Sequence, residues 1–568
     1  GSSPAACEDE DPNPMTGPAG RGVDIATVVA LVIAAIAVID FASGVRLKLD
    51  TGMTGFDSTW YHGPFAASFF QTGNTFDLHY IAPQFLAWFY PANAELFHAV
   101  GMNAFERDLL SPLLNLGWFI GCLVACWCIG QPYGVAPWSL ALGALALSVP
   151  SLADQAGEAR NDIVGVFFLL AAAAIAINAW VDRGSGERSL STGALVVTGL
   201  AAGLAAGTKL NFLLPCAALV IGLVAIAPTG KRWRTAAAVG LPALAGGGYW
   251  YLRNLVHSGN PLPWFDQLGP ISLPAPTQEL GGREGHSVFG YLTDGAVWSD
   301  WFFLGLHDGL GLFWPLLAFA ALASLLLCLS RRSSPLVRVL GAMGLAAALA
   351  WLVAPTSASG PEGMPRGFES GLRYLAPALV LGLALLPIAS PFRERMRSWD
   401  EVGPRRRLAV PTWSLAAAGL LAAAVIAVGY PVQRDYLRDR YANPDFTTPG
   451  LDAAFKWAQP VSGARIATTS TRQYPLFGTD LSNRVQFVGE ERPHGGFVAP
   501  TTCRAWRHAL NAGDYDYVVT SRDRIEPNKP PYPVSAAWTA GPNSEIVLRK
   551  PPTIIFKLKG PMDPSACR

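Results

Sequence analysis

Long apolar stretches dominate most of the chain, and short polar or basic segments separate them. A membrane-crossing helix needs roughly 20 apolar residues, and about eleven runs approach this length. The pattern predicts an α-helical polytopic membrane protein with about eleven transmembrane helices over residues 23–442. The runs begin at Val23, Leu110, Ala136, Ile163, Thr192, Asn211, Thr235, Leu306, Val337, Tyr374 and Leu415.

The pattern changes at both ends of the chain. Residues 1–22 are polar and rich in proline and glycine, which predicts a disordered tail because such a segment cannot bury a core. From residue 443 onward, the segments ARIATTS, YDYVVTS, SEIVLR and TIIFKLK predict short strands. The segments DAAFKWA and CRAWRHALNAG predict helices between them. The sequence therefore predicts a small α/β domain over residues 443–568.

Basic residues occur in the loops that follow alternate apolar runs. Cytoplasmic loops of membrane proteins carry an excess of Lys and Arg, so we expect these loops to face the cytoplasm. With an odd number of spans, the N-terminus is then cytoplasmic and the C-terminal domain is extracytoplasmic. This topology predicts a first outer loop over residues 45–109 and a long outer loop over residues 257–305.

The composition agrees with a membrane protein. Hydrophobic residues make up 51% of the chain and charged residues only 15%, whereas soluble domains carry about 25% charged residues. The net charge of +1 and the scattered basic residues give no reason to expect nucleic acid as a partner, and membrane lipids are the expected surroundings. Frequent Ala, Gly and Arg indicate a GC-rich genome, and we expect a bacterial plasma (inner) membrane, with an actinobacterial source as the interpretation.

The eight cysteines divide by environment. Five of them lie in apolar runs, where cysteine is usually a small buried residue. Cys503 and Cys567 lie in the outer domain, where oxidising conditions allow a disulfide, and we expect them to pair. The cysteines show no zinc-binding spacing.

Asp57 follows the first apolar run directly. After it, Tyr61, Phe65 and Phe69 form an apolar stripe at helical spacing that ends at Gly73, which predicts a helix lying in the membrane interface. An Asp before Ser and Thr is also a common helix N-cap. The residues alone leave Asp57 open as a cap or as a catalytic acid.

A second group of acids precedes the fourth apolar run. Asp154, Glu158 and Asp162 lie there together with Arg160. Glu158 and Asp162 are four residues apart and are expected to share a helical face. The group fits a structural salt-bridge cluster as well as a substrate site.

Three cations fall at the outer ends of other apolar runs, namely Lys209, Arg253 and Arg373. Each alone fits a side chain that reaches for the lipid headgroups. Three cations beside an acid cluster favour an anionic lipid headgroup as ligand, because guanidinium groups bind phosphate oxygens in pairs.

These residues also carry a resemblance to a family. An Asp after the first helix, then an aromatic residue, then small and apolar residues up to a Gly, resembles the first outer loop of the GT-C superfamily of glycosyltransferases. The blocks EARNDIVGVFFLLAA, GLAAGLAAGTKLNFLL, YWYLRNLVHSGNPLP and GLRYLAPAL agree in order, up to about residue 390. The chain is most similar to the branch of protein O-mannosyltransferases and lipid A aminoarabinose transferases. Ser58 departs from the family, since many relatives have Asp-Glu at this place.

The resemblance implies an inverting transfer of a single sugar from a polyprenyl-phosphate-linked donor to a glycan, lipid or protein acceptor. Asp57 would be the general base and Asp162 the second acid, with Glu158 and Asp154 beside it. Lys209, Arg253 and Arg373 would bind the lipid phosphate. Candidate contacts to the sugar or acceptor are Tyr61, His62, Asn93 and Glu95.

Other functions stay open at this point. The same charges fit a transporter or flippase of lipid-linked sugars, although no internal repeat is visible, and they also fit a ligase with a diphosphate-linked donor. No cofactor is expected. His62, His79 and His98, with Glu95 and Asp77, match no metal-ligand spacing, and a divalent metal there stays the alternative.

Overall fold

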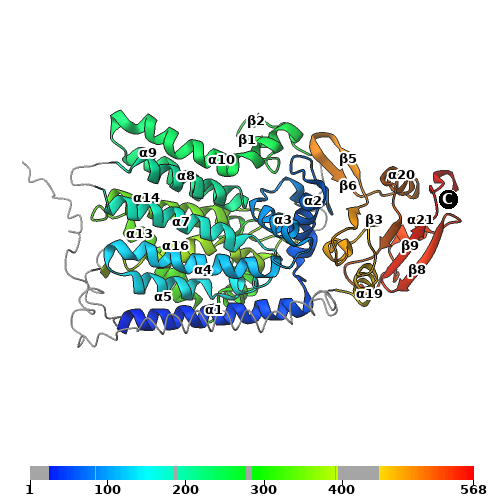
Figure 1. The fold of residues 1–568 in the computed structure, drawn as a ribbon, viewed down its shortest axis with the longest axis horizontal. Coiled ribbons are helices and arrows are strands. Elements are labelled where there is room, and N and C mark those ends of the chain that lie inside the picture. Colours follow the sequence, from blue (N-terminus) through cyan, green and yellow to red (C-terminus); the bar gives the residue numbers. More distant parts are fainter. Residues whose placement is uncertain are drawn as a thin grey trace, which may run out of the picture.

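The computed structural model describes residues 25–83, 85–183, 189–276, 285–389, 392–393 and 447–567. Long helices lie side by side in one bundle, and a smaller part that contains a sheet lies at one end of it (Figure 1). The predicted tail over residues 1–22, the apolar run from Leu415 and most of the basic cluster over residues 393–407 lie outside the described residues.

The other ten apolar runs form eleven helices of the bundle, because the run from Leu306 is divided between two of them. Phe41, Phe119 and Leu169 are among the residues of its core. The helices are α1 (Ile25–Thr51), α4 (Ser111–Gly130), α5 (Ala136–Leu147), α7 (Asp162–Val181), α8 (Thr192–Ala206), α9 (Leu213–Ile226), α10 (Arg232–Ser258), α12 (Phe303–Leu310), α13 (Trp314–Cys328), α14 (Pro335–Val353) and α16 (Ala376–Leu385).

Within the described residues, four helices are long and apolar enough to cross a membrane. They cover Ile25–Thr51, Ser111–Tyr133, Asp162–Val181 and Pro335–Val353. Two bent pairs, Gly295–Leu310 with Trp314–Cys328 and Phe368–Tyr374 with Ala376–Leu385, raise this number to six if each pair is one span. The chain is thus a helical membrane protein, and the total of eleven spans stays a prediction.

The residues after α1 fold into short helices at the end of the bundle that faces the sheet. A π-turn, η1 (Ser58–His62), leads into α2 (Gly63–Thr72), and α2 ends at Gly73, whose positive φ of 62° suits glycine. The apolar stripe of the predicted interfacial helix is buried instead of facing lipid, because it packs against neighbouring segments of the protein. Nearby are η2 (Ala87–Phe89) and α3 (Asn93–Phe105).

Several other short elements complete this end of the bundle. The loop between α5 and α7 contains α6 (Pro150–Ala153), η4 (Leu210–Phe212) joins α8 to α9, and α15 (Phe368–Gly371) and η8 (Leu372–Tyr374) precede α16. The described parts of the predicted long outer loop contain β1 (Gln267–Leu268), β2 (Ile271–Ser272), η6 (Val288–Tyr291), α11 (Gly295–Val297) and the π-turn η7 (Trp298–Phe302).

The C-terminal part is built on a five-stranded sheet with the order β4-β3-β7-β9-β8. β3 is parallel to β4 and β7, and β9 is antiparallel to β7 and β8. Four of the strands were predicted from their β-branched residues, whereas the sequence analysis missed β4. The strands are β3 (Arg465–Thr468), β4 (Arg484–Phe487), β7 (Tyr517–Thr520), β8 (Ser544–Lys550) and β9 (Thr553–Leu558).

Helices cover both faces of this sheet. Successive residues of a strand point to opposite faces, so Ile466 packs with α19 (Pro449–Ala458). Ala467 packs on the other face with residues of α20 (Cys503–Gly513) and α21 (Val534–Thr539). A separate hairpin consists of β5 (Glu490–Arg492) and β6 (Gly496–Val498).

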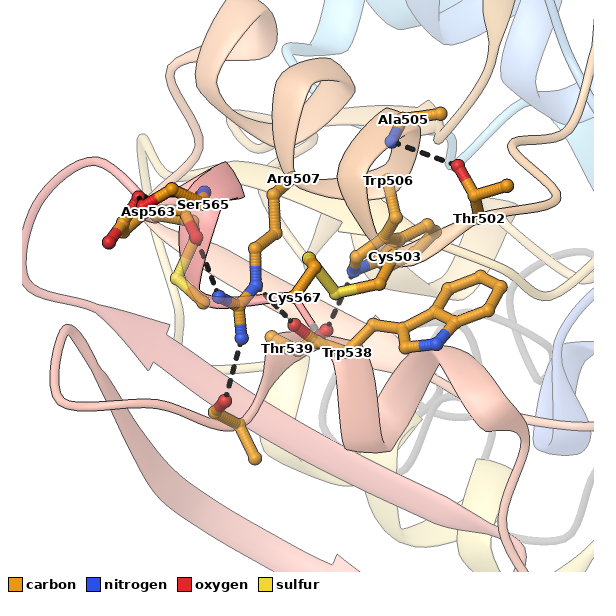
Figure 2. The surroundings of a disulfide bond; sticks show 12 residues. Thr502, Cys503, Ala505, Trp506, Arg507, Trp538, Thr539, Asp563, Ser565 and Cys567 are labelled. Atoms are coloured by element: carbon orange, nitrogen blue, oxygen red, sulfur yellow. Dashed lines mark hydrogen bonds between the residues drawn. A yellow bond between two sulfur atoms is a disulfide. The ribbon is translucent and has the colours of Figure 1, made fainter.

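The chain after β9 is fastened to α20. The sulfur atoms of Cys503 and Cys567, the pair expected from the sequence, are bonded to each other (Figure 2). Arg507 donates hydrogen bonds to the backbone carbonyls of Trp538 and Asp563, at 2.9 and 2.6 Å. The disulfide and this buried arginine together hold the last described residues against α20 and α21.

The sheet part and the bundle share hydrophobic cores. Met53 and Met102, from the bundle side, lie in one buried cluster with Phe455 of α19. Phe497 of β6 lies in a second cluster with Trp88 of η2. The C-terminal part is therefore packed onto the end of the bundle.

Candidate functional site

Asp57 lies between α1 and η1, with helical backbone angles and a buried side chain. Its carboxylate makes no capping hydrogen bond, so the N-cap interpretation does not describe this side chain. Its Oδ2 lies 2.5 Å from Nη2 of Arg373, which is the middle residue of η8. An ion pair thus joins the first loop to the start of α16.

The ion pair belongs to a larger group of charges. Asp162, the first residue of α7, has Oδ1 2.6 Å from Nζ of Lys209 and Oδ2 3.7 Å from Nε of Arg373. Lys209 immediately precedes η4. We call Asp57, Asp162, Lys209 and Arg373 the charged cluster. Two carboxylates and two cations, all largely buried, therefore meet where four elements converge.

The electrostatics of Asp57 are set by two opposing effects. Burial raises the pKa of its carboxyl, but the positive charge of Arg373, followed by those of Arg160 and Lys209, holds the pKa below its ordinary value. Asp57 is therefore ionised at neutral pH and accepts a proton only weakly while Arg373 is beside it.

Tyr374 supports the two cations of the cluster. Nζ of Lys209 lies 4.7 Å and Cζ of Arg373 lies 5.2 Å from the centre of its ring, and Nη2 of Arg373 donates a hydrogen bond of 3.2 Å to its hydroxyl. A ring face attracts cations, so Tyr374 helps to orient both. Tyr374 was not predicted from the sequence as a site residue, although it follows Arg373 in the block GLRYLAPAL.

Glu158 is placed differently from the sequence interpretation. Residues 154–157 form turns and α7 begins only at Asp162, so Glu158 and Asp162 do not share a helical face. The carboxylate of Glu158 accepts a hydrogen bond of 2.9 Å from the amide of Gly55 and lies 3.1 Å from Nζ of Lys48. Glu158 thus anchors the segment just before Asp57.

Asp154 lies at the edge of the same loop. It pairs with Arg160, and its carboxylate is largely exposed. Asn115 of α4 holds the loop by donating hydrogen bonds to the carbonyls of Gln155, Glu158 and Arg160. Asp154 therefore belongs to a structural ion pair beside the charged cluster.

Arg253 does not join the other two cations. It lies buried on α10, and its Nη2 donates a hydrogen bond of 2.8 Å to the carbonyl of Trp88. Its Cζ lies 4.9 Å from the ring of Trp250. In the described part of the chain, no ion pair or hydrogen bond links Arg253 to Asp57 or Asp162. The expected pocket of three cations is thus divided, because α10 directs its arginine to backbone carbonyls of the first loop.

Asn93 is a joint between helices. Its amide nitrogen donates hydrogen bonds to the carbonyls of Leu204 and Gly246, at 3.2 and 2.8 Å, and its oxygen accepts one of 2.8 Å from Nε1 of Trp250. These bonds join α3 to α8 and α10. Asn93 was expected to contact the sugar or acceptor, but the structure uses its hydrogen-bonding groups within the protein.

Tyr61, His62 and Glu95 are also buried. The ring of Tyr61 lies 3.9 Å from that of His62, and Nδ1 of His62 is hydrogen-bonded to Oε1 of Glu95. These side chains therefore face one another in the interior, where the sequence analysis expected contacts to a sugar.

A second chain of polar groups runs from His62 and Glu95. Nδ2 of Asn161 lies 3.4 Å from Oε1 of Glu95 and donates a bond of 2.9 Å to the carbonyl of Thr208. Asn161 and Thr208 directly precede Asp162 and Lys209 in the sequence. We call His62, Glu95, Asn161 and Thr208 the buried polar chain. It connects the segments that carry Asp57, Asp162 and Lys209 of the charged cluster.

The C-terminal part holds the chain on both sides of Asp57. Nη1 of Arg472 donates a hydrogen bond of 3.2 Å to the carbonyl of Thr54, and the amide of Gln473 donates one of 2.9 Å to the carbonyl of Thr59. The next residue, Tyr474, donates a bond of 2.6 Å from its hydroxyl to Oδ2 of Asp108. We call residues 472–474 the clamp segment.

Metal binding was an alternative for the histidines of this region. Among the residues that the structure describes, no group of three or more His, Cys, Asp or Glu side chains is arranged to hold a metal ion. The charged cluster instead contains equal numbers of acids and bases, which pair with each other.

The fold is similar to that of solved membrane proteins. ArnT from Cupriavidus metallidurans in the apo state matches with a TM-score of 0.53 and 17% identity, over 94% of this chain and 98% of that chain. The same protein bound to undecaprenyl phosphate matches with a TM-score of 0.53 and 15% identity, over 93% and 98%. The Archaeoglobus fulgidus oligosaccharyltransferase tethered with an acceptor peptide has a TM-score of 0.44 and 12% identity, over 87% and 69%.

No family model and no curated protein matches this sequence. The match to ArnT covers nearly all of both chains. It shows that this chain has the GT-C fold that its sequence resemblance implied.

Proposed function

We propose that this chain is a glycosyltransferase that moves a single sugar from a polyprenyl-phosphate-linked donor to an acceptor. One observation carries the proposal: the buried carboxylate of Asp57, which directly precedes η1, is held 2.5 Å from the guanidinium of Arg373. Such a pair offers a base and a phosphate-binding cation at one point.

Arg373 and Lys209 are the proposed phosphate ligands. Nε of Arg373 makes no hydrogen bond within the described residues, so it can donate one to a phosphate oxygen. Guanidinium groups bind phosphate with more than one hydrogen bond, and the ammonium of Lys209 adds a second charge. Undecaprenyl phosphate is bound in one of the ArnT structures that share the fold, which supports this class of donor.

The sugar transfer would proceed by one displacement. Asp57 takes the proton of the acceptor hydroxyl, the hydroxyl oxygen forms a bond to the anomeric carbon, and the bond from this carbon to the phosphate oxygen breaks. A single displacement inverts the configuration at the anomeric carbon. General-base catalysis contributes about 10² to 10⁴ in rate, and Arg373 and Lys209 would stabilise the departing phosphate.

Donor binding would also strengthen the base. In the free protein, Arg373 lowers the pKa of Asp57 against the effect of burial. A phosphate that draws the guanidinium toward itself weakens this influence, so burial raises the pKa of Asp57 and the carboxylate accepts a proton more readily. The base would therefore be strongest when the donor is present.

The acceptor is expected on the outer side of a bacterial plasma membrane. The topology expected from the basic loops would put the charged cluster and the C-terminal part on that side. A glycan, lipid or protein of the cell envelope would then meet the sugar at this end of the bundle.

The proposal is tested with Asp57→Asn, measured as transfer of labelled sugar from a polyprenyl-phosphate donor by the purified full chain. We expect a rate at least about 10²-fold lower, with the donor lipid still bound. The matched control is Asp50→Asn, because Asp50 lies on α1 in an exposed pair with Arg46. Transfer by Asp57→Asn at the rate of the unchanged protein would overturn the proposal. Movement of lipid-linked sugar across vesicles without transfer would identify a transporter instead.

A further inference from the structure

The buried polar chain and its surroundings contain side-chain atoms that make no hydrogen bond to any described residue. A buried polar atom without a partner costs stability, and in a native structure such atoms often have a chemical role. Here they gather around one hydrogen-bonded pair, His62 and Glu95. The atoms are Nε2 of His62, Oε2 of Glu95, Nδ1 of His98 and Oδ1 of Asn161.

The π-turn places His62 next to the charged cluster. In η1 the amide of Gly63 donates its hydrogen bond to the carbonyl of Ser58, five residues earlier. The hydrogen bond of a π-turn spans five residues, and Asp57 lies five residues before His62, at the start of this turn. After burial, the charge of Asp57 has the largest influence on the pKa of His62, which agrees with this proximity.

We propose that His62 and Glu95 form a relay that removes the proton that Asp57 takes from the acceptor. The inference rests on the proposed function of Asp57 as a base. The O–H bond of protonated Asp57 breaks as a bond from the proton to Nε2 of His62 forms. The Nδ1–H bond of His62 breaks as a bond from that proton to Oε1 of Glu95 forms. The products are ionised Asp57, a neutral imidazole and protonated Glu95.

The environments of the three groups favour this direction of transfer. Once the phosphate has left, nearby cations again hold the pKa of Asp57 below its ordinary value, and burial lowers the pKa of His62 so that its cation does not persist. Burial raises the pKa of Glu95 to about 8. The proton therefore comes to rest on Glu95. The other charged or titratable groups that face the pair are His98, Asp162, Lys209, Arg373 and Tyr61.

The relay makes turnover depend on pH. Glu95 must be ionised before it can accept the next proton, and its ionised fraction rises as the pH rises through about 8. We therefore expect kcat to increase across this range. Deprotonation of Asp57 does not cause such an increase, because Asp57 is already ionised at lower pH.

The test is the pH profile of sugar transfer by Glu95→Gln in the full chain. Glutamine keeps the size of the side chain and a hydrogen bond to His62, but it cannot accept the proton. We expect kcat to fall about tenfold or more, the increase around pH 8 to disappear, and the KM for the donor to stay unchanged. The control is Glu106→Gln, an exposed carboxylate just after α3, which should leave the profile unchanged.

A second variant separates a proton-transfer role from a structural one. Glu95→Asp keeps a carboxylate on α3 and should retain the increase of kcat with pH at a reduced rate, whereas a purely structural role predicts the same profile for both variants. An unchanged profile in Glu95→Gln, with Asp57→Asn inactive, would overturn the relay and leave the proposed function intact. Full activity of Asp57→Asn would instead overturn the proposed function.

Discussion

Replacing Gly63 with alanine should slow sugar transfer without removing any charge. A Cβ atom at this position would lie 2.5 and 2.6 Å from two ring carbons of Tyr474, and 2.7 Å from the carbonyl oxygen of Ser58. The ring cannot move away easily, because Tyr474 is fully buried and its hydroxyl is bonded to Asp108. Overpacking of this kind costs about 1–3 kcal/mol.

The π-turn that follows Asp57 would have to shift to relieve this clash. A displacement of about 1 Å at a catalytic group can lower a rate by about 10²-fold, so we expect Gly63→Ala to reduce kcat by about 10- to 100-fold and to lower the melting temperature. The assay is transfer of labelled sugar by detergent-purified protein, with thermal unfolding measured on the same samples.

The control for this substitution is Gly117→Ala on α4, where an added Cβ meets no other atom within 4 Å. Alanine in place of glycine inside a helix stabilises it by about 0.5–1 kcal/mol, so this variant should keep its activity and melting temperature or gain stability. If Gly63→Ala matched Gly117→Ala in both measurements, the packing of Tyr474 against the π-turn would not constrain Asp57.

Three further variants test the site and the C-terminal part. Arg373→Gln removes the charge that lowers the pKa of Asp57, so this pKa rises. As the pH is lowered, the variant should therefore lose its residual transfer activity at a higher pH than the unchanged protein does, which a pH–rate profile measures. Asn93→Ala leaves the indole N–H of a buried tryptophan without its acceptor, which costs about 1–3 kcal/mol; the melting temperature should fall while the KM for the donor stays the same. Replacing both Cys503 and Cys567 with serine opens a loop with a sequence separation of 64 and should lower the free energy of unfolding by about 4 kcal/mol, measured by denaturant unfolding with and without reductant.

Local sequence patterns predicted the helices of the bundle and most strands of the sheet. The length of each apolar run indicated the helices of the bundle, and β-branched segments indicated most of the sheet, because these features act over a few neighbouring residues. β4 was missed because its sequence, RVQF, contains a single β-branched residue. The bend between α12 and α13 was also missed, since the apolar run from Leu306 continues through it.

The site was predicted in part for a similar reason. Asp57, Asp162, Lys209 and Arg373 each lie at the end of an apolar run, so the alternation of the helices brings them to one end of the bundle. The pairing of these charges depends on the directions of their side chains, which cannot be predicted from the spacing of residues in the sequence. Arg253 met every criterion that selected Arg373, yet its partner is the carbonyl of Trp88.

The contacts of the clamp segment could not be predicted from the sequence. Tyr474 and Asp108 are 366 residues apart, and nothing in either local sequence indicates the other. Contacts of this length follow from the docking of the C-terminal part on the bundle. The contact between His62 and Glu95 was not predicted either, since both were selected as possible ligand contacts and instead contact each other.

The clamp segment has a consequence for the order in which the protein becomes active. The ribosome makes the four members of the charged cluster before it makes residues 472–474, which hold the backbone on either side of Asp57. A nascent chain that has already inserted its helices thus carries the charged groups without the contacts that fix the loop between them. The protein would therefore become able to transfer sugar only late in its biosynthesis, when the C-terminal part has folded and docked on the bundle.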